Sequence, residues 1–255
     1  MRDLCTWVHM DTVYDAYYNA CLILLGMKAR VNPGNPYINS TTQLGFATFG
    51  APHVLSLLGE VATRALRYVW YQKWFVHRRL RPEDYGGLVH LTATGQKSYP
   101  IHPDMLHSSV LNTVSNKTGS YLLPMAYVEG CPIHPSYGQG HGVIAGACVT
   151  VLKSWFAESG IFADPMAANE DGTSLDAYSG HALTVGNELN KLAGNIGHGR
   201  DMAGVHFRSD YWQGLLLGEK LAISILNDQA GMFNEPCMLE FTGFDGHSAA
   251  INGDR

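Results

Sequence analysis

The feature that most constrains the fold is a long apolar stretch that follows a glycine-rich turn. From His141 to Glu158 the sequence reads HGVIAGACVTVLKSWFAE. A helix that is apolar on all sides must be buried in a protein core or a membrane. No run in the chain reaches the roughly 18 apolar residues of a membrane span. The stretch therefore predicts a helix at the centre of a soluble protein.

Other segments carry apolar residues at helical spacing. The predicted helices cover residues 11–28, 54–79, 183–200 and 209–228. Two Pro- and Gly-containing regions, 82–136 and 160–177, predict long loops, with a short helix or two in the first. Alternating residues in the tail, 236–253, predict a small β-hairpin. Because strand patterns are otherwise scarce, we expect an all-α helical bundle forming a single domain over residues 1–255.

Composition excludes several classes of protein. The chain has 17 Lys and Arg against 22 Asp and Glu, a net charge of −5, which disfavours binding to nucleic acid or to acidic membranes. Its five cysteines contain no CxxC pair, so we expect buried thiols rather than disulfides or a zinc cluster. The N-terminus lacks the pattern of a signal peptide. A charged fraction of 15% is low, which indicates extra buried or interface surface, as in an oligomer.

A basic cluster ends the second predicted helix. Residues 73–82 hold four of the chain's 17 Lys and Arg residues. Lys73 and His77 are four residues apart, which predicts a shared helix face. Arg81 precedes Pro82, so its backbone is biased away from the helical region and its side chain can turn toward Lys73. The plainer interpretation is a solvated basic helix end.

A glycine-rich loop leads directly into the central helix. Residues 134–142 include His134, Gln139, Gly140 and His141. Free N–H groups at a helix N-terminus form an anion site, and a glycine lets the ligand approach closely. His141 at this end can act as an acid or a base. The plainer interpretation is a helix cap with two incidental histidines.

A third cluster joins the last two predicted helices. His206 and Asp210 are four residues apart, which predicts that Asp210 accepts the second ring N–H of His206 and raises the basicity of its free nitrogen. Arg200 offers a bidentate fork for an oxyanion. The plainer interpretation is a structural His–Asp pair. Together, the three clusters contain the parts of a pocket for a tetrahedral oxyanion.

The spacing of these clusters resembles the signature of the vanadium-dependent haloperoxidases, in their algal and cyanobacterial bromoperoxidase branch. That family shares a superfamily with type 2 phosphatidic-acid phosphatases and bacterial acid phosphatases. The eight-residue step from Lys73 to Arg81 fits the bromoperoxidases better than the phosphatases, whose step is usually seven. Stretches 121–142, 190–210 and 215–226 are also similar to that branch. The chain as a whole resembles the C-terminal catalytic half of these enzymes.

The resemblance implies a role for each site residue. His206 would bind vanadium, with Asp210 behind it. The equatorial oxygens of vanadate would contact four groups: Lys73, Arg81, Arg200 and the Gly140 N–H. His141 would bond the apical oxygen, His134 would be the extra pocket histidine of bromoperoxidases, and Trp70 would lie near the halide. Gln139 stands where the family has Ser. Algal relatives also carry structural calcium, and Asp104, Glu83 and Asp84 lie in the corresponding region.

The implied activity is oxidation of bromide or iodide by hydrogen peroxide, giving hypohalous acid that halogenates small organic acceptors. Two alternatives remain at this point. The first is an acid phosphatase that uses the same pocket, with His206 as nucleophile. The second is a non-catalytic remnant that packs in a homo-oligomer, which Gln139 and the half-length resemblance favour.

Overall fold

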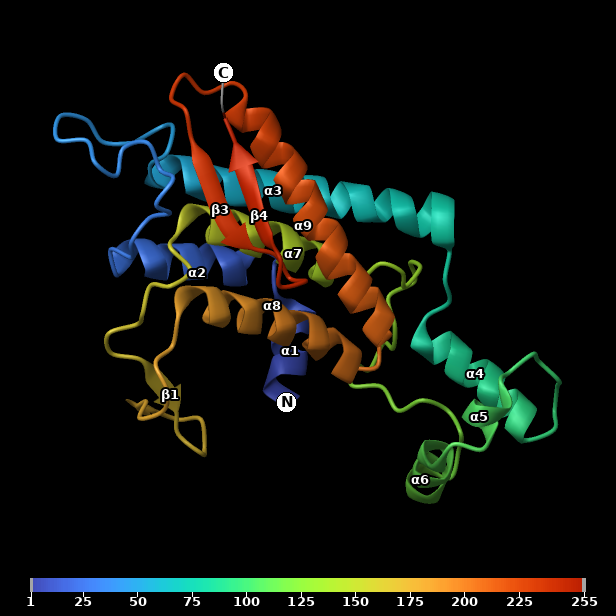
Figure 1. The fold of residues 1–255 in the computed structure, drawn as a ribbon. Coiled ribbons are helices and arrows are strands. Elements are labelled where there is room, and N and C mark those ends of the chain that lie inside the picture. Colours follow the sequence, from blue (N-terminus) through green and yellow to red (C-terminus); the bar gives the residue numbers. More distant parts are fainter. Residues whose placement is uncertain (1, 254–255) are drawn as a thin grey trace.

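The structure is a computed structural model that describes residues 2–253, and it is a helical bundle with two small β-hairpins (Figure 1). The predicted all-α class is therefore confirmed. The elements are α1 (Arg2–Met10), α2 (Asp15–Gly26), α3 (Ala51–Tyr71), η1 (Gln72–His77), α4 (Pro82–Ala93), α5 (Pro103–Leu106), α6 (Ser109–Thr118), α7 (Gly140–Trp155), β1 (Met166–Ala168), β2 (Leu175–Ala177), α8 (Val185–Met202), α9 (Arg208–Ala230), β3 (Met238–Thr242) and β4 (Ser248–Asn252).

Helix α7 is the centre of the bundle. Every residue from Gly142 to Trp155 is buried, as the apolar stretch predicts. Helices α3, α8 and α9 pack around it (Figure 1). The first N–H groups of α7 therefore lie at the end of the bundle where the glycine-rich loop joins the helix. The core thus fixes where the glycine-rich loop must end.

Two glycines allow α7 and α9 to approach closely. A Cβ atom added at Gly146 would lie 2.0 Å from the Leu215 carbonyl oxygen. A Cβ atom added at Gly218 would lie 2.0 Å from the Val143 carbonyl oxygen. Both neighbours are backbone atoms of the facing helix, which cannot move aside cheaply. The contact between these helices therefore requires glycine at both positions.

The helix predicted over 54–79 changes type near its end. After Tyr71 the chain continues as the π-helix η1, in which the Arg78 N–H bonds to the Lys73 carbonyl oxygen, a step of five residues. The two residues of the predicted shared face, Lys73 and His77, nevertheless have different surroundings. Lys73 is buried, whereas His77 is exposed and packs edge-on against the Tyr137 ring. Arg78 then ends the helix in the left-handed region at φ 46°.

Helices α4, α5 and α6 form an arm that projects to one side of the bundle (Figure 1). The region 82–136 is thus more helical than predicted. The arm has its own small core of three buried residues, Val89, Ile101 and Leu111, with aromatic and leucine side chains packed around them. Its first helix begins at Arg81, the N-cap residue, followed by Pro82 at the first helical position. The base of the arm therefore carries one of the predicted site residues.

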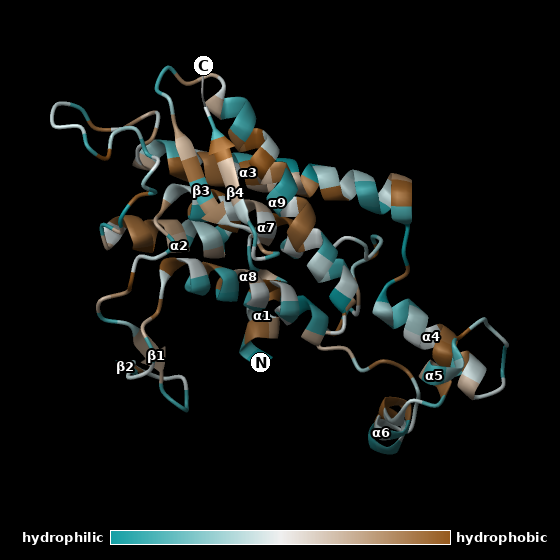
Figure 2. Cartoon of the chain, in the orientation of Figure 1, coloured by the Kyte–Doolittle hydropathy of each residue, from teal (hydrophilic) through white to brown (hydrophobic). Residues whose placement is uncertain are grey.

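The predicted C-terminal hairpin is confirmed, and a second one was missed. Strands β3 and β4 pair antiparallel and lie against α7 and α9 (Figure 2). Strands β1 and β2 form a short hairpin within 160–177, where the sequence predicts only a loop. Three-residue strands with exposed side chains leave no alternating pattern to detect.

Two further expectations concern cysteine and membranes. The buried thiols are confirmed at Cys5, Cys21, Cys148 and Cys237, whereas Cys131 is half-buried. Over residues 2–253, no helix combines the length and the apolar character that a bilayer crossing requires.

Candidate active site

Three cationic side chains from three elements are buried near one another. Lys73 comes from η1, Arg81 from the N-cap of α4 and Arg200 from the last turn of α8, and they are 0%, 3% and 7% exposed. The Lys73 amine donates to the carbonyl oxygens of Pro135 and Ser136 at 2.7 and 3.0 Å. Burial and the charges of Arg81 and Arg200 lower the pKa of Lys73 to about 7. The site thus carries more positive charge than its own residues neutralise.

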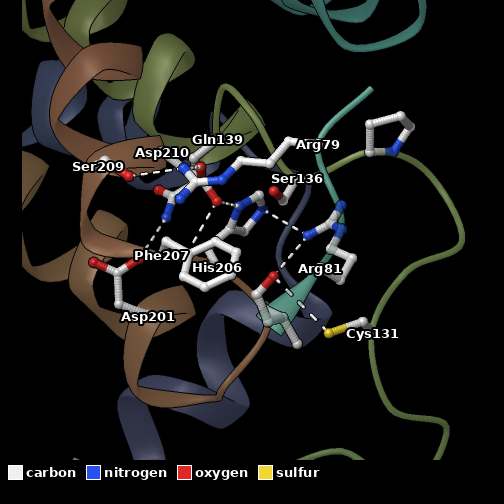
Figure 3. Close-up of polar contacts among 12 residues, drawn as sticks. Arg79, Arg81, Cys131, Ser136, Gln139, Asp201, His206, Phe207, Ser209 and Asp210 are labelled. Atoms are coloured by element: carbon white, nitrogen blue, oxygen red, sulfur yellow. Dashed lines mark hydrogen bonds and ion pairs between the residues drawn. The ribbon is translucent and has the colours of Figure 1, made fainter. Parts of the chain in front are cut away.

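Arg81 contacts both histidines, His134 and His206, and the backbone on each side of the site (Figure 3). Its Nε donates to the His134 carbonyl oxygen at 2.7 Å, and its Nη1 donates to the Val205 carbonyl oxygen at 2.8 Å. Nη1 also lies 2.9 Å from His206 Nε2, and Nη2 lies 3.0 Å from His134 Nδ1. Burial, then Arg81 and Lys73, lower the pKa of His134 to about 3, so both histidines face Arg81 as neutral acceptors.

His206 contacts Asp210 as the sequence predicts, but for a different reason. The distance from His206 Nδ1 to Asp210 Oδ2 is 3.1 Å. His206 does not lie on the helix, because α9 begins at Arg208 and Phe207 is its N-cap residue. Asp210 turns back toward the chain before the helix, where it also accepts the Phe207 N–H at 3.0 Å. The contact therefore arises from helix capping rather than from a shared helix face.

The pairing with Asp210 fixes the tautomer of His206. A carboxylate at Nδ1 keeps the proton there, which leaves the Nε2 lone pair facing Arg81. Burial, followed by the charges of Arg81, Lys73 and Arg200, lowers the pKa of His206 well below its usual value. A neutral imidazole whose Nε2 carries no proton is the form that can bind a metal or attack phosphorus, once Arg81 releases that nitrogen.

Arg79 is a site residue that sequence analysis missed. Its Nη1 donates to Asp210 Oδ1 and to Ser209 Oγ, both at 2.8 Å (Figure 3). The guanidinium also lies over the Phe207 ring, 4.2 Å from its centroid. Arg79 thus neutralises the carboxylate behind His206. It lies within the basic cluster, but nothing in the sequence joins it to a residue more than 100 positions away.

His141 has a carboxylate partner that sequence analysis also missed. Its Nε2 lies 2.8 Å from Asp11 Oδ1, and both side chains are largely buried. Asp11 belongs to the loop between α1 and α2, and no sequence pattern links that loop to the start of α7. Burial lowers the pKa of His141 despite this pairing. His141 also contributes to the lowered pKa of His206, so it lies within range of the same pocket.

Arg200 is held from the N-terminal segment. Its Nη1 donates to the Val8 carbonyl oxygen at 2.8 Å and to the Tyr127 hydroxyl at 3.4 Å. Among the residues that the structure describes, Arg200 Nε is buried and has no hydrogen-bond partner. An unpaired guanidinium N–H in the interior is costly, because it has lost its water. The group is therefore ready for an acceptor that the protein does not itself supply.

Gln139 occupies the N-cap position of α7 with its side chain turned toward α8. Its Nε2 donates to the Gly197 carbonyl oxygen at 3.1 Å and to Asp201 Oδ1 at 3.2 Å. These contacts use both protons of the amide, while Oε1 is buried without a partner among residues 2–253. Burial and the charge of Asp210 raise the pKa of Asp201 to about 7. Gly140 follows as the first residue of α7.

Trp70 lies next to the pocket histidine. The centroids of the Trp70 and His134 rings are 4.4 Å apart, and the angle between the ring planes is 44°. Trp70 is 41% exposed, so one side of this pair faces solvent. The structure therefore brings Trp70 and His134 together at the edge of the site.

The acidic residues considered for calcium are engaged elsewhere. Glu83 Oε2 accepts the Cys131 N–H at 2.6 Å, and Asp84 Oδ2 accepts the Arg81 N–H at 3.2 Å. Asp104 lies in α5. No group of three or more His, Cys, Asp or Glu side chains within residues 2–253 is arranged to hold a metal ion. Structural calcium stays a prediction that these contacts do not support.

The whole arrangement suits a tetrahedral oxyanion. Three buried cations lie near a neutral histidine, and the N-terminus of α7 adds its own N–H groups. Within the described part of the chain, the Arg200 Nε–H has no partner. Carboxylates pair with two of the histidines, Asp210 with His206 and Asp11 with His141. An anion with several oxygens would satisfy the unpaired donor and offset the crowded positive charge.

Comparisons with known proteins agree with this chemistry. A family model described as VCPO second helical-bundle domain matches residues 107–235, about half of the chain. Vanadium-dependent bromoperoxidases from Corallina pilulifera and Ascophyllum nodosum are 45% and 39% identical over 98% and 96% of this chain, and over 46% of each relative. The homohexameric structure of the second vanadate-dependent bromoperoxidase of Ascophyllum nodosum matches with a TM-score of 0.90 at 30% identity, covering 99% of this chain and 50% of that chain. The chain thus spans about half the length of the curated relatives that it matches.

Proposed function

Since the chain belongs to the vanadium-dependent haloperoxidase family, we propose that it holds vanadate and oxidises bromide or iodide with hydrogen peroxide to hypohalous acid. The acid then halogenates small organic acceptors. The observation that carries this proposal is the cluster of three buried cations around neutral His206. Such a cluster is unfavourable unless an anion is bound, and vanadate is an anion with oxygens in several directions.

Particular groups of the chain would hold vanadate. His206 would bind vanadium through Nε2, because Asp210 keeps the proton on Nδ1. Lys73, Arg81 and Arg200 would donate to the oxygens, together with the Gly140 N–H at the start of α7. The unpartnered Arg200 Nε supports this fit. When bound, vanadate supplies a Lewis acid that activates peroxide without changing its own oxidation state.

The histidines would manage protons. The contact between His141 Nε2 and Asp11 Oδ1 keeps a proton on Nε2, which leaves Nδ1 as the atom able to accept one from hydrogen peroxide. His134 is neutral near physiological pH, since its pKa is lowered to about 3, so it would act as an acceptor of hydrogen bonds. Lys73 would offset negative charge that develops on the bound oxygens.

Gln139 has a different role in this proposal. Its amide protons already bond to Gly197 and Asp201 on α8. We therefore propose that Gln139 anchors α7 against α8 and contributes to vanadate binding indirectly, by fixing the position of the Gly140 N–H. A serine at this position would free Asp201 and could reach the pocket.

We also propose that the chain works as a homo-oligomer. A related bromoperoxidase of known structure is a homohexamer. Several large apolar side chains of this chain are exposed, among them Leu44, Phe46 and Phe75 at 86%, 72% and 73%. Size-exclusion chromatography with light scattering of the purified chain measures this directly.

The test is a bromination assay of the chain loaded with vanadate. With bromide, hydrogen peroxide and a halogen acceptor, we expect vanadate-dependent bromination. The His206→Ala variant should lose about 10³-fold or more of the activity, because it removes the bond to vanadium. His181→Ala, which changes an exposed histidine, is the matched control. Activity in His206→Ala equal to wild type would contradict the site.

The alternatives have their own outcomes in the same preparation. Hydrolysis of an aryl phosphate that vanadate inhibits, without bromination, would identify a phosphatase that uses His206 as nucleophile. Stable oligomers that show no heat of vanadate binding would identify a non-catalytic remnant.

A further inference from the structure

A pocket of about 480 Å³ opens beside the site residues Arg81 and His134. This volume falls within the range of small-molecule sites, roughly 300–1,000 Å³. We call it the mouth pocket, and its lining is Trp74, Arg78, Arg79, Leu80, Arg81, Glu83, Asp84, Cys131, Pro132, Ile133, His134 and Pro135. Since Arg81 bonds to His206, a molecule in the mouth pocket lies next to the proposed oxidising centre.

One side of the mouth pocket is apolar. Trp74, Leu80 and Ile133 are 41%, 50% and 101% exposed, and together they give one pocket an apolar surface. Pro132 and Pro135 add rigid apolar surface. A flat apolar ring could lie against these side chains and bury them from water.

The charges of the mouth pocket are not equivalent. Arg79 is held by Asp210 and Ser209, and Arg81 is bonded to His134, Val205 and His206. The oxygens of Glu83 and Asp84 accept backbone N–H groups of Cys131 and Arg81.

Arg78 is the remaining charged group. Within residues 2–253 its guanidinium forms no ion pair and no side-chain hydrogen bond, and its backbone is left-handed at φ 46°. The left-handed conformation is a common way for a helix to end, and here it ends η1 beside the mouth pocket. Arg78 is therefore a cation that the fold presents to the pocket without giving it a partner.

We propose that the mouth pocket binds the organic halogen acceptor, and that it selects a single-ring phenol or enol that carries a carboxylate. The ring would lie against Trp74 and Ile133, and the carboxylate would pair with Arg78. This inference rests on the proposed function, because the pocket has a substrate only if hypohalous acid forms beside it.

The reaction in the pocket balances without a further reagent. Hypobromous acid transfers bromine to an electron-rich ring carbon, a C–Br bond forms and the O–Br bond breaks. The ring carbon loses its proton, and that proton leaves with hydroxide as water. The oxidising equivalent comes from the peroxide that the proposed function consumes.

The first test measures binding without turnover. The probes are 4-hydroxybenzoate and 4-hydroxybenzamide, which have nearly the same shape and differ in charge, and the readouts are titration calorimetry and quenching of tryptophan fluorescence. We expect the acid to bind about tenfold more tightly than the amide, as one charge-assisted pair allows. Arg78→Asn, a residue that tolerates left-handed backbone, should remove this preference. Arg67→Ala, which removes an exposed arginine from α3, should keep it. Equal binding of the two probes to wild type would overturn the proposal.

The second test separates this inference from the proposed function. Bromide oxidation without an organic acceptor, followed as tribromide, depends only on the oxidising centre. We expect Arg78→Asn to leave that rate unchanged, to raise the KM for 4-hydroxybenzoate about tenfold, and to leave the KM for 4-hydroxybenzamide unchanged. If the wild-type protein forms tribromide but shows the same KM for 4-hydroxybenzoate and 4-hydroxybenzamide, the inference about the mouth pocket is wrong and the proposed function stands. Absence of tribromide formation in wild type would sink the proposed function.

Discussion

The bundle around α7 and the arm formed by α4–α6 differ in how much of each is buried. Fourteen consecutive residues of α7 are buried, whereas the arm has three buried apolar residues of its own. The proposed active site lies across this boundary. His141 and Arg200 come from the bundle, while Arg81 and His134 come from the base of the arm and the loop that returns from it.

This difference separates two tasks. The bundle holds the α7 N-terminus and the His206–Asp210 pair in place, because α7 and α9 pack backbone against backbone at Gly146 and Gly218. The arm has little core, so its opening costs less than global unfolding. We infer that the bundle holds most of the oxyanion site, that Arg81 joins it from the base of the arm, and that the arm sets access to the mouth pocket.

The largest expected effect is a loss of stability in the bundle. Gly218→Ala places a Cβ atom 2.0 Å from the Val143 carbonyl oxygen and should lower the free energy of unfolding by about 3 kcal/mol. Gly59→Ala on α3 meets nothing within 4 Å and should raise it by up to about 1 kcal/mol. Urea denaturation of both variants measures the contrast, and similar stabilities would contradict the close packing of α7 and α9.

The next effect concerns the pair at the end of the bundle. Asp210→Asn keeps the shape of the side chain but removes the charge that orients His206 and pairs with Arg79. Vanadate affinity should fall about 10–100-fold. Asp228→Asn, an exposed position on the same helix, is the control. Calorimetric titration with vanadate decides, and an unchanged affinity would remove Asp210 from the site.

A smaller effect sharpens the view of the arm. Leu111→Ala should cost about 2 kcal/mol within the small core of the arm. Hydrogen exchange should then rise in α4 and α6 while α7 stays protected. Equal loss of protection in both regions would mean that arm and bundle unfold together.

The last effect is a pH dependence of anion affinity. The pKa of Lys73 is lowered to about 7 by burial and by Arg81 and Arg200, and a bound anion offsets these charges and raises it again. Between pH 7 and 9 binding should therefore take up about one proton, and affinity should fall by up to about tenfold per pH unit. Sulfate is the probe, because its own charge is constant in this range. Lys73→Met should abolish the proton uptake, and uptake that persists in this variant would assign it to another group.

Local patterns in the sequence predicted the helices and one of the contacts in the proposed site. The apolar stretch identified α7, and the spacing of His206 and Asp210 identified their contact. Pairings across the fold were not predictable, because Asp11 with His141 and Arg79 with Asp210 join residues about 130 positions apart. Lys73 and His77 both lie in η1, yet only Lys73 is buried, and their four-residue spacing does not reveal that difference.

The π-helical turn also has an evolutionary consequence. One residue inserted into an α-helix can be absorbed as a wider turn while the flanking turns keep their neighbours. Without that residue in η1, the step from Lys73 to Arg81 would be seven instead of eight. The insertion or deletion of a single residue in η1 is therefore enough to alter the spacing of Lys73 and Arg81, two proposed anion-binding residues, without displacing α3 or α4.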